Sequence, residues 1–188
     1  MLIIKKISPI LLGILLFFSN MELVWSRAIE KQVVLAVLTL NVARFTSWPE
    51  QIFNTEEATL NLCVFGDNVV QNAFEDIDNK TINNKTINIV NLSRLRNVNR
   101  CQLLYLSGLE QSRLILLLAE IQGQAILTVG ENMGFLQAGG MVGLEKVEGK
   151  IRLTINLTQI EQTELVISSR LLKLAKIVNF STPTQKSK

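Results

Sequence analysis

The sequence predicts an α/β fold: a three-layer sandwich with a mostly parallel, doubly wound sheet and a C-terminal antiparallel hairpin. Two observations carry this prediction. Short apolar runs that end in glycine or a polar turn alternate with stretches at helical spacing, as expected of parallel strands joined by helices. Near the C-terminus, two segments of alternating apolar and polar residues flank Glu148-Gly149, which is typical of a hairpin turn.

The N-terminal segment, residues 1–26, has the pattern of a signal peptide. Two lysines precede an almost purely apolar run from Ile7 to Phe18, and Val24-Trp25-Ser26 offers small residues to a signal peptidase. We therefore expect export across a membrane with cleavage near Ser26. An uncleaved membrane anchor is the alternative, although the run is shorter than the roughly 20 residues that a span needs.

Length and charge limit the number of domains and the kinds of partner that the remaining chain can have. The whole sequence has 188 residues, 48% of them hydrophobic and 19% charged, which suits one domain with a sizeable core. We expect this domain at residues 27–180, followed by a polar tail at 181–188. The formal net charge of +3 is too small, and its lysines and arginines too dispersed, to predict a nucleic-acid partner.

The first helix is expected at residues 29–44. Between Val33 and Val42 only Thr39 and Asn41 are polar, and a helix that is apolar nearly all round is covered on most sides by its own domain or by a partner. Trp48-Pro49 ends this segment, because proline disfavours a helical residue before it.

The following elements are assigned from their periodicity and their turn residues. We expect strands at Leu60–Phe65, Ile87–Leu92, Cys101–Leu106 and Ala125–Val129, helices at Asn68–Ile77, Glu110–Ile121 and Ser169–Val178, and a hairpin of Met141–Val147 with Lys150–Leu157. Asp67 is expected to cap the second helix, since its carboxylate can accept the free N–H groups of the first turn.

Catalytic motifs are largely missing from the sequence. It contains no histidine, which removes the commonest general base, the Ser-His and Cys-His pairs and most zinc sites. The glycines of Gly139–Gly143 open a strand and not a helix, so they predict a turn and close packing instead of a phosphate-binding loop. We expect no enzyme activity, no cofactor and no metal site.

Polar residues follow three of the predicted strands. Asp67, Ser107 and Glu131 would lie at the carboxyl edge of the sheet, where parallel sheets bind ligands. The alternatives are a helix cap for Asp67 and a solvated loop position for Glu131. We prefer these structural roles, because no second catalytic group accompanies either carboxylate.

The cysteines Cys63 and Cys101 fall on the first and third predicted strands, which are often neighbours in a doubly wound sheet. An exported chain meets an oxidising compartment, so a disulfide is favoured over the alternative of two buried free thiols.

Five segments in order resemble the YfiR family of small periplasmic regulators. They are Asn41–Pro49, Leu62–Asp67, Ala125–Val129, Gly139–Gly143 with Ile151–Asn156, and Ile167–Ala175. The resemblance implies a periplasmic protein that docks on the outer part of a membrane-bound diguanylate cyclase, or a related sensor, and lowers cyclic di-GMP production. It also implies a homodimer that responds to redox state.

Two departures from the family pattern concern the partner surface and the redox response. The first helix carries Leu35, Leu38, Leu40 and Val42 where the family tends to have a lysine and aromatic residues. A second cysteine pair, which described members can carry late in the chain, is missing, so Cys63 and Cys101 alone would support redox switching.

Two functions follow as hypotheses. A docking protein would contact its partner through Leu38, Phe45 and Trp48, for each of which a plain core position is the alternative. Such a protein should expose an apolar patch on the first helix. A small-ligand sensor or carrier would instead use a crevice beside Asp67, Ser107 and Glu131.

Overall fold

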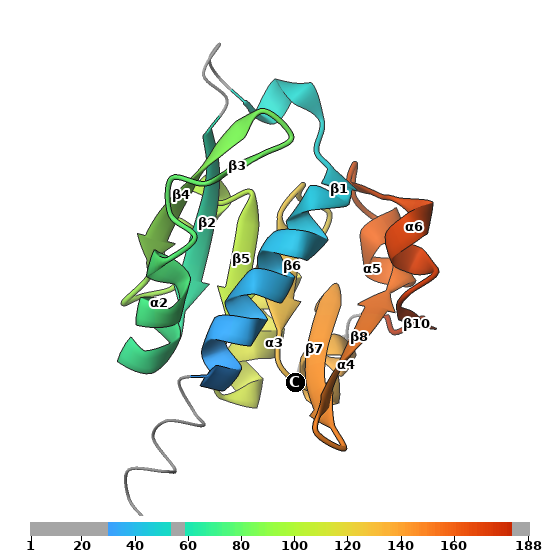
Figure 1. The fold of residues 1–188 in the computed structure, drawn as a ribbon. Coiled ribbons are helices and arrows are strands. Elements are labelled where there is room, and N and C mark those ends of the chain that lie inside the picture. The colour runs from blue at the N-terminus through green and yellow to red at the C-terminus, as the bar shows by residue number, and fades with distance from the viewer. Residues whose placement is uncertain (1–29, 54–58, 182–188) are drawn as a thin grey trace, which may run out of the picture.

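The protein forms three layers in the computed structural model, which describes residues 30–53 and 59–181 (Figure 1). The expected signal peptide, the residues around the cleavage site and almost all of the polar tail lie outside the described residues. A first helix at residues 30–44 and α2 (Asn68–Glu75) contribute to the apolar core on one face of the central sheet. Helices α3 (Gln111–Glu120) and α4 (Met133–Gln137) pack on the other face.

Two sheets are present within the described residues. Their strands are β1 (Thr46–Ser47), β2 (Thr59–Phe65), β3 (Thr81–Ile82), β4 (Lys85–Asn91), β5 (Leu103–Leu106), β6 (Leu127–Gly130), β7 (Val142–Val147), β8 (Lys150–Asn156), β9 (Val166–Ile167) and β10 (Lys176–Val178). β1 and β9 form a small antiparallel pair, and the others form one sheet in the order β10-β8-β7-β6-β5-β2-β4-β3. From β4 across to β7 all neighbours are parallel, whereas β7 and β8 form the antiparallel hairpin. The predicted fold class is confirmed.

The connections wind in both directions from the centre of the sheet. α2 follows β2 and leads to β4 on one side, while α3 follows β5 and leads to β6 on the other. The chain therefore reverses its winding between β2 and β5, and the two connecting helices pack on opposite faces. The remaining helical elements are short: η1 (Glu50–Ile52), η2 (Val98–Arg100), α5 (Leu157–Glu161) and α6 (Ser169–Leu172).

Glycines at the start of β7 allow α4 to lie directly on the sheet. A Cβ on Gly140 would lie 2.2 Å from Cε1 of Phe135, and one on Gly143 would lie 2.9 Å from Cδ1 of Leu136. Gly139 has a φ of +106°, which side chains rarely adopt. The prediction that these glycines serve a turn and close packing is confirmed.

The prediction of a long C-terminal helix at Ser169–Val178 is wrong. Only Ser169–Leu172 is helical, and Lys176–Val178 forms the edge strand β10, parallel to β8. The side chain of buried Asn156 holds the end of this segment in place: its Oδ1 accepts from the Phe180 backbone N–H at 2.9 Å, and its Nδ2 donates to the Phe180 carbonyl at 3.0 Å. These hydrogen bonds and the strand pairing outweigh the helical spacing of the leucines and lysines.

Several boundaries also differ from expectation. Leu157 begins α5 instead of ending the hairpin strand, and the short α4, α5, β1, β3 and β9 were not foreseen. Cys101 follows η2, so the third long strand begins only at Leu103. Asp67 caps α2 as predicted, accepting from the Val70 N–H at 2.9 Å.

A disulfide joins Cys63 and Cys101, as predicted. Cys63 lies in β2, Cys101 lies just before the neighbouring β5, and their Cα atoms are 5.7 Å apart. Both residues are fully buried in the core on the α3 face of the sheet. The bond therefore ties the two central strands together at a place that solvent does not reach.

Replacing both cysteines should lower stability substantially. The bridged residues are 38 positions apart, and closing a loop of that length contributes about 4 kcal/mol in the chain-entropy estimate. We expect Cys63→Ala with Cys101→Ala to lose about 2–4 kcal/mol in the free energy of unfolding, measured by urea denaturation. The reduced wild-type protein is the control and should behave like the variant. A loss below about 1 kcal/mol would contradict a stabilising bridge.

Candidate functional site

The register of two parallel strands brings polar side chains together at the carboxyl edge of the sheet. In the β5 and β6 pair, Leu106 lies opposite Gly130, the last residue of each strand. The next residues along the chain, Ser107 and Glu131, are therefore adjacent. Tyr105, near the end of β5, belongs to the core on the first-helix face, and its hydroxyl reaches the same carboxylate.

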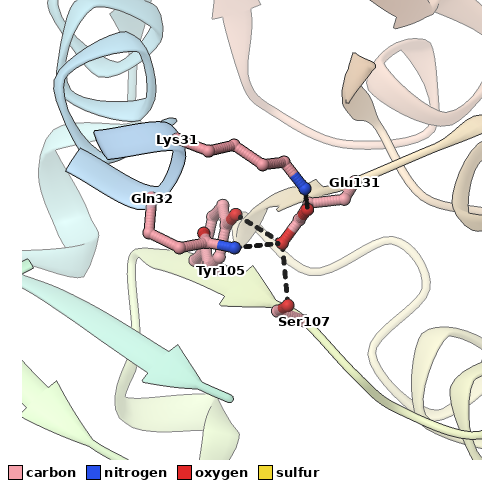
Figure 2. Close-up of polar contacts among 5 residues, drawn as sticks. All are labelled: Lys31, Gln32, Tyr105, Ser107 and Glu131. Atoms are coloured by element: carbon pink, nitrogen blue, oxygen red, sulfur yellow. Dashed lines mark hydrogen bonds and ion pairs between the residues drawn. The ribbon is translucent and has the colours of Figure 1, made fainter. Parts of the chain in front are cut away.

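The first turn of the first helix adds Lys31 and Gln32 to this group, so that four side chains meet at Glu131 (Figure 2). Oε1 of Glu131 accepts from the Ser107 hydroxyl at 2.7 Å, from the Tyr105 hydroxyl at 3.1 Å and from the Gln32 amide at 3.4 Å. Oε2 forms an ion pair with Nζ of Lys31 at 2.5 Å. We call these five residues the Glu131 cluster.

The cluster keeps Glu131 ionised and Tyr105 protonated. Partial burial by itself favours the neutral carboxyl, but hydrogen bonds from Lys31 and Ser107 and the charge of Lys31 outweigh it, and the pKa of Glu131 lies below its ordinary value. Burial, followed by the charge of Glu131 and the hydrogen bond to it, raises the pKa of Tyr105 far above its usual range. Tyr105 thus acts as a permanent donor.

This arrangement fastens the first helix to the sheet. Both carboxylate oxygens of Glu131 are already engaged by four donors, two from the first helix, one from β5 and one from the residue that follows β5. The group therefore has little capacity left to accept a proton or bind a ligand. The solvated loop position that we preferred for Glu131 from the sequence is therefore wrong, because its side chain is only 18% exposed and is engaged by these donors. It is the anchor of a polar contact between two layers.

The hollow beside Ser107 and Glu131 is small. It has a volume of about 60 Å³, whereas sites for small organic ligands usually measure about 300–1,000 Å³. The third residue predicted for a ligand crevice, Asp67, is exposed and does not line this hollow. Two of the three residues meet, in a space that suits water or a single small ion.

The outward side of the first helix carries apolar residues. Val34, Val37 and Phe45 are 42%, 45% and 37% exposed. Val34 and Val37 lie three positions apart and so share one face of the helix, and Phe45 directly follows the last helical residue. We call these three residues the outer stripe. The inward side, with Leu35, Leu40 and others, is buried in the core. The segment Val33–Val42 is therefore not buried throughout.

The three residues predicted to contact a partner occupy different environments. Phe45 belongs to the outer stripe, while Leu38 is half-buried and packs against the core. Trp48 is buried, and its indole N–H donates to the Gln102 carbonyl at 2.9 Å, which secures the chain beside the start of β5. Only Phe45 offers a partner a large apolar surface.

Sequence reasoning missed Lys31, Gln32 and Tyr105 of the cluster and Val34 and Val37 of the stripe. Valine at positions 34 and 37 was visible as part of an apolar run, but the run alone does not show which side faces the sheet. Tyr105 lies two residues before Ser107, so it projects from the same strand end, a signal that the sequence did contain.

Neither a metal site nor a membrane span is found in the part of the chain that the structure describes. No group of three or more histidine, cysteine, aspartate or glutamate residues there is placed to hold a metal ion. No helix there is long and apolar enough to cross a membrane.

The fold and the site together define the class of protein: a small, disulfide-linked α/β domain in which the Glu131 cluster supports the structure and the first helix presents an apolar stripe. Residues 32–176 match the model of the YfiR/HmsC-like family, and the chain belongs to this family. No curated protein matches the sequence.

Glu131→Gln should destabilise the protein in a pH-dependent way. At pH 7 we expect a loss of about 1–2 kcal/mol, because charge-assisted hydrogen bonds weaken and Lys31 is only about one-third exposed to screening water. A carboxyl whose pKa is lowered by folding stabilises above its unfolded pKa, about 4.3, and loses that contribution as pH falls through its folded pKa. The difference between the two proteins should therefore shrink below about pH 4.

Urea denaturation from pH 3 to pH 8 measures this difference. Glu164→Gln is the matched control, because Glu164 is exposed and forms no ion pair among the described residues. It should change stability little at any pH. An equal effect of the two substitutions at pH 7 would show that the Glu131 cluster does not hold the helix.

Proposed function

We propose that this protein is a periplasmic regulator that docks on the extracytoplasmic domain of a membrane-bound diguanylate cyclase and represses it, lowering cyclic di-GMP in the cell. Members of the YfiR/HmsC-like family are periplasmic regulators rather than enzymes. The residues of the Glu131 cluster have structural partners, which is consistent with a binding protein without catalysis.

The observation that carries this proposal is the outer stripe. Exposed valines lower the helix propensity of a segment without contributing to the core, because their β-branched side chains lose freedom in a helix. Val34 and Val37 are both exposed on a helix whose other side is fully packed. The stability of the domain gives no reason for this apolar face, whereas a partner that covers it does.

The position of the stripe also suits docking. Phe45 lies directly after the helix, and its backbone carbonyl accepts from the Ser168 N–H at 2.8 Å, so the end of the stripe is held in place. The Glu131 cluster holds the other end of the helix. A surface that is rigid before binding loses little conformational entropy when a partner docks.

Polar substitutions in the stripe should relieve repression without unfolding the protein. In a host that carries the native cyclase, deletion of the gene should raise cyclic di-GMP, and the wild-type gene should restore the lower level. We expect Val34→Ser with Val37→Ser to fail in this restoration, because two apolar contacts are lost from the interface.

Leu116→Ser is the matched control for this experiment. Leu116 is also exposed, but it lies on α3, which packs on the opposite face of the sheet. This variant should restore the low level of cyclic di-GMP. Normal repression by a folded Val34→Ser, Val37→Ser protein would contradict docking through the stripe, and no rise on deletion of the gene would contradict the repressor function itself.

We further propose that the protein forms a homodimer, as implied by its family. Sedimentation of the purified, disulfide-bonded protein should give about twice the mass of one chain. The Val34→Ser, Val37→Ser variant should keep that mass if the stripe serves the cyclase and not the second copy. A monomeric wild-type protein at micromolar concentration would contradict the dimer.

A further inference from the structure

An arginine-lined groove lies on the face of the sheet opposite the first helix. It is bounded by the end of β2 at Phe65, by the loop after β4 and by α3, and it has a volume of about 410 Å³. This volume falls within the usual range for sites that bind small organic molecules. The hollow at Glu131, by contrast, has about 60 Å³.

Three arginines from two separate elements line the groove. Arg94 and Arg96 come from the loop after β4, and Arg113 comes from the first turn of α3. Among the described residues, no carboxylate lies within ion-pair distance of any of them, and the one ion pair found there is Lys31 with Glu131. Glu120 is the single acidic residue of the lining, so the groove carries a net positive charge.

Apolar side chains line the groove beside the arginines. Phe65 and Leu117 are largely buried and form part of the core on this face, while Leu116 is exposed beside them. Arginine is the cation best suited to such a place, because its planar, weakly hydrated guanidinium binds phosphate and carboxylate groups in a bidentate manner. A ligand with an anionic head and an apolar body would satisfy both kinds of lining.

The topology of the sheet gives a separate reason to expect a ligand near the carboxyl end of β2. The winding reverses between β2 and β5, and in open α/β sheets ligands bind outside the carboxyl ends of the strands at such a reversal. Phe65 is the last residue of β2 and lines the groove. One end of the groove therefore lies near this reversal, and the groove extends from there along α3 to Glu120.

We propose that this groove binds a small organic anion, with Arg94, Arg96 and Arg113 holding its phosphate or carboxylate group and Phe65 and Leu117 contacting its apolar part. This site is separate from the outer stripe and does not depend on the proposed docking function. Phosphate and carboxylate share the chemistry that the arginines recognise, and the probes below distinguish them.

Calorimetric titration of the purified, disulfide-bonded protein tests this site with four probes: phenyl phosphate, benzoate, inorganic phosphate and phenol. We expect saturable binding of phenyl phosphate or benzoate, tighter than that of inorganic phosphate and weakened by added salt. Tighter binding of phenyl phosphate identifies a phosphate ester as the ligand class, and tighter binding of benzoate identifies a carboxylate. Phenol, which lacks the charge, should not bind.

Arginine substitutions locate the binding. Arg94→Gln with Arg113→Gln should weaken binding of the preferred probe at least about tenfold, because two charge-assisted contacts are lost. Arg152→Gln, at an exposed position of β8 outside the groove, should leave binding unchanged. Thermal melting checks that each variant is folded, and Arg96→Gln alone serves if the double variant is not. Binding of no anionic probe, equal binding of phenol, or unchanged binding by the groove variants would overturn the proposal.

Discussion

The packing of the first helix on the sheet is the contact on which the outer stripe depends. Leu35 and Leu40 are buried against the core, and burial of a leucine contributes about 1.5–3 kcal/mol. The Glu131 cluster contributes less, about 1–2 kcal/mol, because Lys31 is partly exposed. Apolar packing therefore supplies most of the stability, while the directional polar contacts fix where the helix begins and which side faces outward.

These separate roles of apolar packing and polar contacts also explain why the outer stripe faces outward. A helix that is apolar nearly all round has no single preferred face, so packing alone would allow it to rotate. The ion pair of Lys31 with Glu131 and the hydrogen bond from Gln32 select one rotation. Val34, Val37 and Phe45 are left outside in that rotation. At the centre of the sheet, the buried disulfide joins β2 to the start of β5, so the platform beneath the helix is itself rigid.

Periodicity and turn residues were sufficient to predict most of the sheet. The glycine-ended runs, the hairpin at Glu148-Gly149, the cap at Asp67 and the pairing of Cys63 with Cys101 all follow from local patterns and simple topology. The C-terminal segment was mispredicted because its leucines and lysines have helical spacing, whereas its conformation depends on a distant residue, Asn156. Short elements such as α4 and β9 likewise depend on tertiary contacts that no local pattern reveals.

The candidate site was only partly predictable for a similar reason. Ser107 and Glu131 were placed together because they follow parallel strands, and their register confirms that they meet. Lys31 and Gln32, the helix partners of Glu131, are about a hundred residues away from it in the chain, so no sequence spacing indicates that they complete the cluster. The arginine groove was hidden too, since Arg94 and Arg113 come together only when the loop after β4 meets α3.

Site-specific crosslinking in living cells tests the docking surface most directly. A photoreactive amino acid would be placed at position 37, in the outer stripe, and in a matched variant at position 116 on α3. Docking through the first helix predicts a crosslink from position 37 to the extracytoplasmic domain of a diguanylate cyclase and none from position 116. A cyclase crosslink from position 116 alone, or none from position 37 in cells whose cyclic di-GMP remains repressed, would contradict the account.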